Sequence, residues 1–312
     1  MRVLETARIK YSKYPIVLGV AVGIKYRKRQ ATDEVGIVFF VEKKEDMPLK
    51  KLPRYLYGRF ANGRVNLRKR IKTDVIQVGR VEFACGAGSE VSPIGGDSGT
   101  ITLFFRNKAI SDPTSYYILT CSHVVGNMED SPPVGEYRNL RSPCCAGIYP
   151  FAETVKNSVI EQDRMPYDIA LAEVTDKGLA HLGPANLPQL DGSVIGTGRV
   201  LKEILPNVRI ELYDEVECAV ARTGGGHFTA NISMLATDFP VKLEGREVWV
   251  SDLYTIELDV EGGDSGGLVY RDRAAIGMII ARSPEGWAWF HPLDNALNYL
   301  GKLNPPRQLK IF

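Results

Sequence analysis

Three residues of the sequence have the types that perform nucleophilic hydrolysis. His123 ends an apolar run that closes in small residues, Asp168 begins another apolar run, and Ser265 lies in the glycine-rich segment 262–267. A serine hydroxyl becomes a strong nucleophile when an imidazole takes its proton, and a carboxylate on the other ring nitrogen fixes the imidazole tautomer. We therefore predict that His123 is the general base, Asp168 the orienting carboxylate and Ser265 the nucleophile.

The glycines around Ser265 add a second part of that chemistry. They permit a sharp backbone turn that aims two N–H groups at one point, where the charge of an oxyanion can develop. The three residues are far apart in sequence, in the order His, Asp, Ser. The fold must therefore assemble them.

These motifs resemble those of trypsin-like serine proteases of the chymotrypsin fold, over about residues 90 to 300. The resemblance rests on Gly-Asp-Ser-Gly-Gly at 263–267, on the histidine after an apolar run and on Asp-Ile-Ala-Leu at 168–171. It implies two six-stranded β-barrels, with His123 and Asp168 on the first barrel and Ser265 on the second. It also implies that the amides of Gly263 and Ser265 form the oxyanion hole.

The same resemblance implies a substrate-binding residue. Asp259 stands six residues before the nucleophile, where trypsin-like enzymes have the floor of the specificity pocket. A carboxylate in a narrow, poorly hydrated pocket attracts Arg or Lys. We therefore predict cleavage after basic residues, with the alternative that Asp259 points to solvent.

Two sequence differences from the secreted members of this family bear on the cellular compartment and on activation by cleavage. Val124 and Glu261 stand where those enzymes carry cysteines, which favours an intracellular branch without disulfides. Ile16-Val-Leu-Gly only faintly imitates their freed N-terminal end and lies far upstream of His123. We expect no activation by cleavage before Ile16.

The N-terminal part resembles a group of bacterial trypsin-like proteins related to the plant narrow-leaf protease. The similar segments are 17–24, 41–44, 72–79 and the later Gly-Thr-Ile-Thr at 99–102. This resemblance implies a small α/β module ahead of the barrels.

Hydrophobic patterning predicts a mainly β fold. Short runs rich in Val, Ile, Phe and Tyr, separated by Gly, Pro, Asn and Asp, are expected to be strands: 36–42, 100–105, 116–121 and 274–281. A C-terminal helix is expected over 293–300, and a basic helical or loop segment over 48–59. A composition change predicts a basic α/β module over 1–84 and a protease domain over 85–312. The expected fold is a chymotrypsin-like double β-barrel between that module and the C-terminal helix.

Composition narrows the function classes and the compartment. The 312 residues carry 39 Lys and Arg against 37 Asp and Glu, a balance that argues against binding nucleic acid through a global basic field. The sequence contains no apolar run long enough to span a bilayer. Basic residues before the stretch 15–24 imitate a signal peptide, but Glu5 interrupts them. We expect a cytoplasmic protein with reduced cysteines, no cofactor and no metal.

Several alternatives remain open at this point. Ser98 lies in an almost identical Gly-Gly-Asp-Ser-Gly segment, but it precedes His123 and is explained by a tight turn. His181, His227 and His291 have no ligand spacing, and the basic run 64–72 is most often a solvated face. The expected function is a serine endopeptidase for protein or peptide substrates, with a regulatory partner bound through residues 1–84. One rival function is a catalytically silent protein-interaction scaffold. Another is a nucleic-acid-associated protein that uses the basic N-terminal patch, which would show steep salt-dependent binding.

Overall fold

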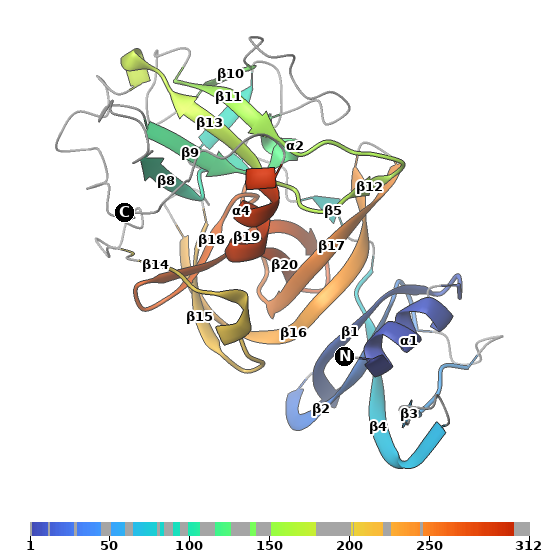
Figure 1. The fold of residues 1–312 in the computed structure, drawn as a ribbon. Helices are drawn as coiled ribbons and strands as arrows, with labels where there is room; N and C mark the ends of the chain where they lie inside the picture. Colours follow the sequence, from blue (N-terminus) through green and yellow to red (C-terminus); the bar gives the residue numbers. More distant parts are fainter. Residues whose placement is uncertain are drawn as a thin grey trace.

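Strands dominate the computed structural model, as the sequence predicted. In Figure 1 the N-terminal module lies to one side of two β-barrels, and the C-terminal helix lies where the barrels meet. The structure describes residues 2–11, 13–27, 30–44, 51–59, 65–79, 82–83, 90–93, 99–106, 116–125, 138–141, 151–178, 201, 203–220, 226–243 and 246–302.

The first barrel is an antiparallel sheet whose segments pair in the order β7-β6-β10-β11-β13-β9-β8. Only Ile101 and Thr102 separate β7 from β8, so these two segments act as one strand and the ring has six strands. Its segments are β6 (Glu90–Pro93), β7 (Gly99–Thr100), β8 (Leu103–Arg106), β9 (Tyr116–Thr120), β10 (Arg138–Arg141), β11 (Ala152–Asn157) and β13 (Ala170–Val174).

The second barrel closes because β17 pairs with β16 as well as with β20. The remaining pairs β15–β16, β15–β18, β18–β19 and β19–β20 complete a ring of six strands. The strands are β15 (Glu215–Val220), β16 (Gly226–Leu243), β17 (Arg246–Glu257), β18 (Leu268–Arg271), β19 (Ala274–Ser283) and β20 (Trp287–Pro292). Together the two rings confirm the predicted double-barrel fold.

Short elements flank the second barrel. β12 (Arg164–Met165) pairs with β17 in parallel, and β14 (Glu203–Ile204) pairs with β19 in parallel. A 3-10 turn, η2 (Asn207–Arg209), follows β14. No helix in the part of the chain that the structure describes is both long and apolar enough to cross a membrane.

The N-terminal module is a small α/β unit. Its elements are α1 (Arg2–Tyr11), β1 (Val17–Arg27), β2 (Gln30–Val41), β3 (Tyr55–Arg59) and β4 (Val65–Gln77). Leu4, Ala7 and Tyr11, spaced three and four residues apart, bury one face of α1 against the sheet. The expectation of a helical or loop segment over 48–59 is wrong for 55–59, which pair with β4 as β3, whereas 48–50 lie outside the described residues.

This module shares a sheet and a core with the second barrel. β1 pairs with β16 at Val22 and Leu235, and β5 (Glu82–Phe83) pairs with both β16 and β19. The ring of Phe40 meets the ring of Phe239 edge-on, with 5.5 Å between the centroids. The module is therefore continuous with the second barrel, and the boundary near residue 84 stays a prediction.

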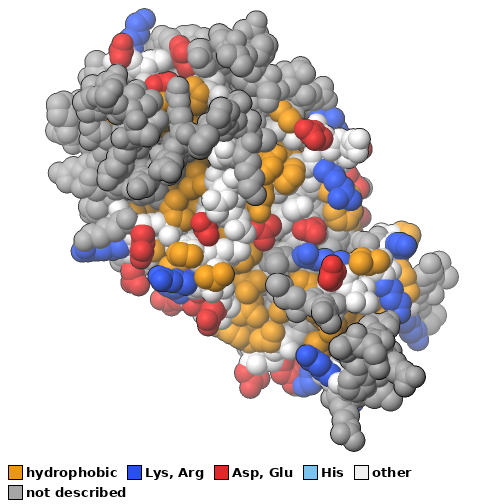
Figure 2. Space-filling model, viewed as in Figure 1, with side chains coloured by type: hydrophobic (Ala, Val, Ile, Leu, Met, Phe, Trp, Pro, Cys, Tyr) orange, Lys and Arg blue, Asp and Glu red, His pale blue; other side chains and the backbone are white. Residues whose placement is uncertain are grey.

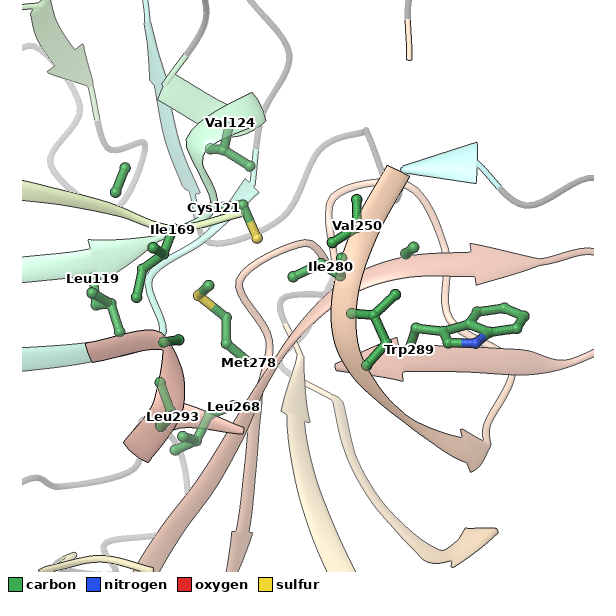
Figure 3. Packing of buried hydrophobic residues seen from close by; sticks show 14 of the residues in the cluster. Leu119, Cys121, Val124, Ile169, Val250, Leu268, Met278, Ile280, Trp289 and Leu293 are labelled. Atoms are coloured by element: carbon green, nitrogen blue, oxygen red, sulfur yellow. The ribbon is translucent and has the colours of Figure 1, made fainter. Parts of the chain in front are cut away.

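The predicted C-terminal helix is present as α4 (Leu293–Lys302), and it packs at the junction of the barrels. Figure 3 shows Leu119, Cys121 and Ile169 of the first barrel near Leu268 and Met278 of the second, in one continuous core. This core sets the two barrels in a defined relation, which the site requires.

Candidate active site

The structure brings the three predicted residues together. His123 lies in α2 (Ser122–Val125), directly after β9; Asp168 lies just before β13; Ser265 lies in the turn between β17 and β18. His123 Nδ1 is 2.5 Å from Asp168 Oδ2, and His123 Nε2 is 2.9 Å from Ser265 Oγ. The result is a continuous hydrogen-bonded series of carboxylate, imidazole and hydroxyl across the two barrels.

Asp168 is bound on both its carboxylate and its backbone. Its Oδ1 accepts a hydrogen bond from the backbone N–H of His123 at 3.0 Å, which adds to the contact with the ring. Its own N–H donates to His291 Nε2 at 2.9 Å. Because His291 Nε2 accepts this bond, the ring is neutral with its proton on Nδ1.

Burial determines the charge state of His291. The side chain is fully buried, and this lowers its pKa to about 4, although the nearby Asp168 carboxylate acts in the opposite direction. His291 Nδ1 has no hydrogen-bond partner among the described residues. At neutral pH the residue is therefore an uncharged acceptor for the Asp168 amide.

The turn that carries Ser265 depends on glycine at one position. Gly266 has φ +89, a conformation that L side chains rarely adopt, and a Cβ there would clash with the carbonyl oxygen of Thr100. The N–H of Gly266 donates to the carbonyl of Ile279 in β19 at 2.8 Å. The glycine is required both for the turn and for the close approach of the first barrel.

The first barrel binds this turn through Thr100. Its N–H donates to the Ser265 carbonyl at 2.5 Å, and its Oγ1 donates to the Gly263 carbonyl at 2.8 Å. Thr120 Oγ1 in turn donates to the Thr100 carbonyl at 2.8 Å. The backbone of the nucleophile turn is thus attached to β7 and β9.

Gly263 lies in the same turn, with φ +95, and is buried. Asp264 Oδ2 accepts a hydrogen bond from the Glu261 N–H at 2.8 Å, so this carboxylate shapes the turn from within. The assignment of the Gly263 and Ser265 amides to an oxyanion hole stays a prediction.

All three side chains are shielded from water. The side chains of His123 and Asp168 are 2% and 0% exposed, and Ser265 is 0% exposed. Electrostatic interactions are stronger in such a low-dielectric site than in water. The same burial means that the Ser265 hydroxyl must become reachable before a substrate can meet it.

One group of residues in the described chain has the spacing of a metal site. Cys121, His123 and Asp168 offer ligand atoms that lie within 4.8 Å of one another. His123 Nδ1 and Asp168 Oδ2 already bind each other, and Cys121 Sγ contacts the Ile279 carbonyl at 3.4 Å. The hydrogen-bonded series of Asp168, His123 and Ser265, called the triad below, accounts for this cluster. The absence of a metal stays a prediction.

Asp259 does not lie in the environment that the specificity argument assumes. It follows β17, and its side chain is exposed to solvent. A carboxylate selects basic side chains strongly when it is desolvated, and this one is hydrated in the free chain. Its role as a pocket floor stays a prediction.

The other residues considered in the sequence analysis lie away from the triad or outside the described residues. Ser98 and His181 lie outside the described residues. His227 is exposed on β16. In the basic run, Lys72 pairs with Glu34 at 2.5 Å and Arg70 lies 4.2 Å above the Tyr55 ring.

Figure 2 shows Lys and Arg side chains gathered over the N-terminal module at lower right, beside acidic ones. Arg64 and the side chain of Arg68 lie outside the described residues. Lys69, Arg70 and Lys72 are exposed, and Arg70 and Lys72 contact other residues of the module. The described members of the basic run therefore form a solvated face like those common on globular proteins.

Sequence reasoning missed three features of the site. It gave no role to His291, Tyr167 or Thr100, because each acts through a contact between segments far apart in the chain. It also missed α1, although the apolar spacing of Leu4, Ala7 and Tyr11 is a helical signal.

A surface cavity of about 410 Å³ lies apart from the triad, between α1, β1 and the second barrel. Its lining includes Arg8, Val17, Arg164, Asp238 and Trp249.

Comparisons with known proteins give fold neighbours only at low identity. No family model matches the chain, and no curated protein matches it. Among solved structures, a glutamic acid specific serine protease that utilizes a histidine triad in substrate binding is 15% identical, with a TM-score of 0.48 over 72% of this chain and 99% of that one. Protease A of Thermobifida fusca is 16% identical, with a TM-score of 0.46 over 69% and 95%.

The chymotrypsin of Cellulomonas bogoriensis is also 16% identical, with a TM-score of 0.44 over 73% of this chain and 97% of that one. The first neighbour is named a serine protease, the second a protease and the third a chymotrypsin. Because the identities and TM-scores are low, the function of this chain is argued from its own side chains.

Proposed function

We propose that the chain is a serine endopeptidase that cleaves protein or peptide substrates through an acyl-enzyme. The observation that carries this proposal is the series Asp168 Oδ2, His123 Nδ1, His123 Nε2 and Ser265 Oγ, joined at 2.5 and 2.9 Å. The 2.9 Å distance lies within the usual range of catalytic hydrogen bonds, about 2.6 to 3.2 Å, and the 2.5 Å contact between His123 and Asp168 is slightly shorter.

Each residue has one role in the proposed reaction. His123 Nε2 takes the Ser265 proton as Oγ attacks the substrate carbonyl carbon, and then gives that proton to the leaving amine as the peptide bond breaks. Asp168 fixes the ring with the proton on Nδ1 and stabilises the imidazolium. Water then attacks the acyl-enzyme with His123 again acting as base, which releases the acid and restores Ser265.

The oxyanion that forms in each step needs donors. The amides of Gly263 and Ser265 are the proposed ones, each worth about a hundredfold to a thousandfold in rate. Thr100 acts on this turn through the Gly263 and Ser265 carbonyls and not through the proposed donors. Thr100 therefore occupies neither of these N–H groups.

The alternative function is a catalytically silent interaction scaffold, and the complete burial of Ser265 is the observation that favours it. Labelling with a fluorophosphonate separates the two. A protease reacts in the wild type and fails to react in Ser265→Ala, whereas a scaffold gives no serine adduct in either. Ser98→Ala is the matched control, and it should label like the wild type.

The proposal includes specificity for Arg or Lys, which depends on Asp259. The exposed Asp259 can still bind a basic side chain at close range, but with a weaker preference than a desolvated carboxylate. A peptide library digested by the wild type and by Asp259→Ser tests it. A basic preference that is unchanged in Asp259→Ser, or an acidic or apolar preference in the wild type, contradicts the pocket assignment.

We further propose that the enzyme acts in the cytoplasm on a defined partner bound through residues 1–84. Cys121 and Cys218, the cysteines in the described part of the chain, are buried and form no disulfide, which is compatible with a reducing compartment. Ile9 of α1 is 64% exposed and offers an apolar contact. Ile9→Asp should change the set of proteins cleaved in a native extract while turnover of a short peptide stays the same; equal sets contradict the partner role.

A further inference from the structure

A series of hydrogen bonds outside the triad connects Asp168 to the second barrel. Tyr167, the residue before Asp168, donates its hydroxyl to Asp252 Oδ2 at 3.0 Å. Asp252 lies in β17, and the same oxygen accepts a hydrogen bond from Asn295 Nδ2 of α4 at 2.5 Å. One carboxylate therefore joins the segment that carries Asp168 to a strand and to the C-terminal helix.

The backbone of Asp252 is itself in an unusual conformation. Its φ is +55, in the left-handed region where non-glycine residues are uncommon and where Asp and Asn are tolerated best. Its N–H donates to Asp238 Oδ1 in β16 at 3.2 Å. Asp238 Oδ2 lies 3.4 Å from Arg8 Nη1 in α1, so the series extends into the N-terminal module.

Burial sets the protonation of the Tyr167 and Asp252 pair. Desolvation, followed by the nearby Asp252 charge, raises the pKa of Tyr167, so the phenol remains a donor at every pH at which the protein would act. Desolvation also raises the pKa of Asp252, while the bonds from Asn295 and Tyr167 oppose that shift.

The Tyr167 ring is packed on two sides. Its centroid lies 5.1 Å from that of His291 and 5.2 Å from that of Tyr299. His291 is also the acceptor for the Asp168 N–H. Tyr167 and Asp168 are thus bound to the second barrel and α4 through adjoining contacts.

We propose that Tyr167 and Asp252 are positioning residues for Asp168, a role that rests on the proposed protease function. Three contacts determine where the Asp168 carboxylate lies: its bond to His123, the bond of its amide to His291 and the bond of Tyr167 to Asp252. Neither Tyr167 nor Asp252 touches the reacting atoms. They act by limiting rotation of the segment from which Asp168 projects.

This role predicts a loss in kcat with little change in KM. A displaced Asp168 orients His123 poorly and stabilises the imidazolium less, whereas the substrate contacts are unaltered. The acidic limb of the pH profile should move to lower pH for the same reason. Among the described residues, the titratable groups facing Asp168 are His123, His291 and Cys121. Those facing Asp252 are Tyr167, Tyr254, Asp238 and Arg8.

The test compares Tyr167→Phe with Tyr299→Phe in the full chain. Tyr167→Phe keeps the ring and removes only the bond to Asp252, and should lower kcat about tenfold to a hundredfold with KM within about twofold. Tyr299→Phe makes the same chemical change in the neighbouring ring and should match the wild type. Asp252→Asn keeps an oxygen acceptor and tolerates the backbone conformation, so its loss should be smaller.

A spectroscopic measurement separates this proposal from the proposed function. The proton between His123 and Asp168 gives a low-field proton NMR signal whose position depends on their contact, whether or not a substrate is cleaved. A shifted or exchange-broadened signal in Tyr167→Phe, with the wild-type position in Tyr299→Phe, supports the proposal. A Tyr167→Phe protein that is folded by circular dichroism and equals the wild type in kcat, pH profile and signal overturns it.

Failure of the proposed function has a different signature. If the proposed function is wrong, the wild-type protein shows neither hydrolysis nor serine labelling. The NMR comparison still decides whether Tyr167 positions Asp168. If Tyr167→Phe does not fold, Asp252→Asn takes its place in the comparison, and wild-type behaviour of Asp252→Asn in all three readouts then overturns the proposal.

Discussion

The two barrels contribute different parts of the site, and each positions a residue of the other. The first barrel supplies His123 and Asp168, and its Thr100 binds the turn that carries Ser265. The second barrel supplies Ser265, and its His291 binds the amide of Asp168. The site is therefore a property of the junction, and neither barrel could form it alone.

The two Gly-Gly-Asp-Ser-Gly segments contribute to the junction in different ways. The second segment, 262–266, forms the turn whose serine lies 2.9 Å from His123 Nε2. The described end of the first segment, Gly99, begins β7 and leads into Thr100, which binds that turn. Similar sequences thus have different roles: the second segment forms the turn, and the described end of the first leads into the residue that binds it.

The largest expected effect is the difference in kcat between two single variants, Ser265→Ala and Ser98→Ala. Ser265→Ala should lower kcat by about a millionfold, since the nucleophile is lost. Ser98→Ala should keep turnover within a few-fold of the wild type. Peptide hydrolysis by the two purified proteins provides the measurement, and a greater loss in Ser98→Ala would reverse the assignment.

The next largest effect is expected from replacing Gly266, compared with replacing Gly99 of the other segment. Gly266→Ala introduces a side chain at φ +89 and against the Thr100 carbonyl, so the Ser265 turn must move. We expect a loss in kcat/KM of about a hundredfold to a thousandfold, comparable with losing one oxyanion donor.

Gly99→Ala is the comparison variant. A Cβ at Gly99 would lie 2.3 Å from the buried side chain of Val124 and 3.0 Å from the Ser265 carbonyl. Gly99 does not have the positive φ of Gly266, so we expect a smaller loss in kcat/KM. Steady-state kinetics and thermal unfolding of both variants provide the measurement. Equal losses would show that the turn does not require the glycine conformation at 266.

A smaller effect isolates the contribution of the first barrel to the Ser265 turn. Thr100→Val removes the Oγ1 that donates to the Gly263 carbonyl and leaves a buried acceptor unsatisfied. This should lower the free energy of unfolding by about 1 to 3 kcal/mol and kcat by about tenfold.

Thr102→Val is a close control, because Thr102 Oγ1 is buried without a hydrogen-bond partner among the described residues. Denaturant unfolding and kinetics of the two variants provide the measurement. If Thr102→Val costs as much as Thr100→Val, the bond to Gly263 is not what stabilises the turn.

The pH dependence of stability isolates the contribution of the second barrel to Asp168. His291 has a folded pKa of about 4 against an ordinary value of 6.5. Between these values the unfolded chain binds more protons, so this residue makes stability fall as pH falls from 6.5 to 4, by about 3 kcal/mol in total. Above about pH 7 its contribution to the slope is small and fades to zero.

His291→Gln removes the titrating ring and can place an amide oxygen near the position of Nε2. The difference in unfolding free energy between the wild type and His291→Gln should therefore change across pH 6.5 to 4 and stay constant above pH 7. Denaturant unfolding at a series of pH values measures this difference. A difference that does not change with pH would show that His291 titrates normally in the fold.

Much of the site could be predicted because its chemistry depends on residue type. His123, Asp168 and Ser265 stand in motifs specific enough to be recognised before any contact is known, and the structure places them within hydrogen-bond distance. The mainly β fold and the C-terminal helix follow from periodicity and turn residues for the same reason.

The positioning contacts could not be predicted, because they join segments without any local pattern. Nothing in the sequence around His291 indicates that it binds the amide of Asp168, 123 residues earlier. β3 was not predicted as a strand, because its pairing with β4 decides the conformation of a short segment that has weak periodicity of its own. Tertiary contacts outweigh propensity in such segments.

The central claim is that His123, Asp168 and Ser265 form a working acyl-transfer site, and trapping the acyl-enzyme tests it most directly. The wild type is mixed with 4-nitrophenyl acetate, quenched in acid during the first turnover and mapped by peptide mass spectrometry. We predict an acetyl group on Ser265, none on Ser98 and no adduct in Ser265→Ala. An acetyl group on Ser98, or ester hydrolysis by Ser265→Ala at the wild-type rate, would contradict the account.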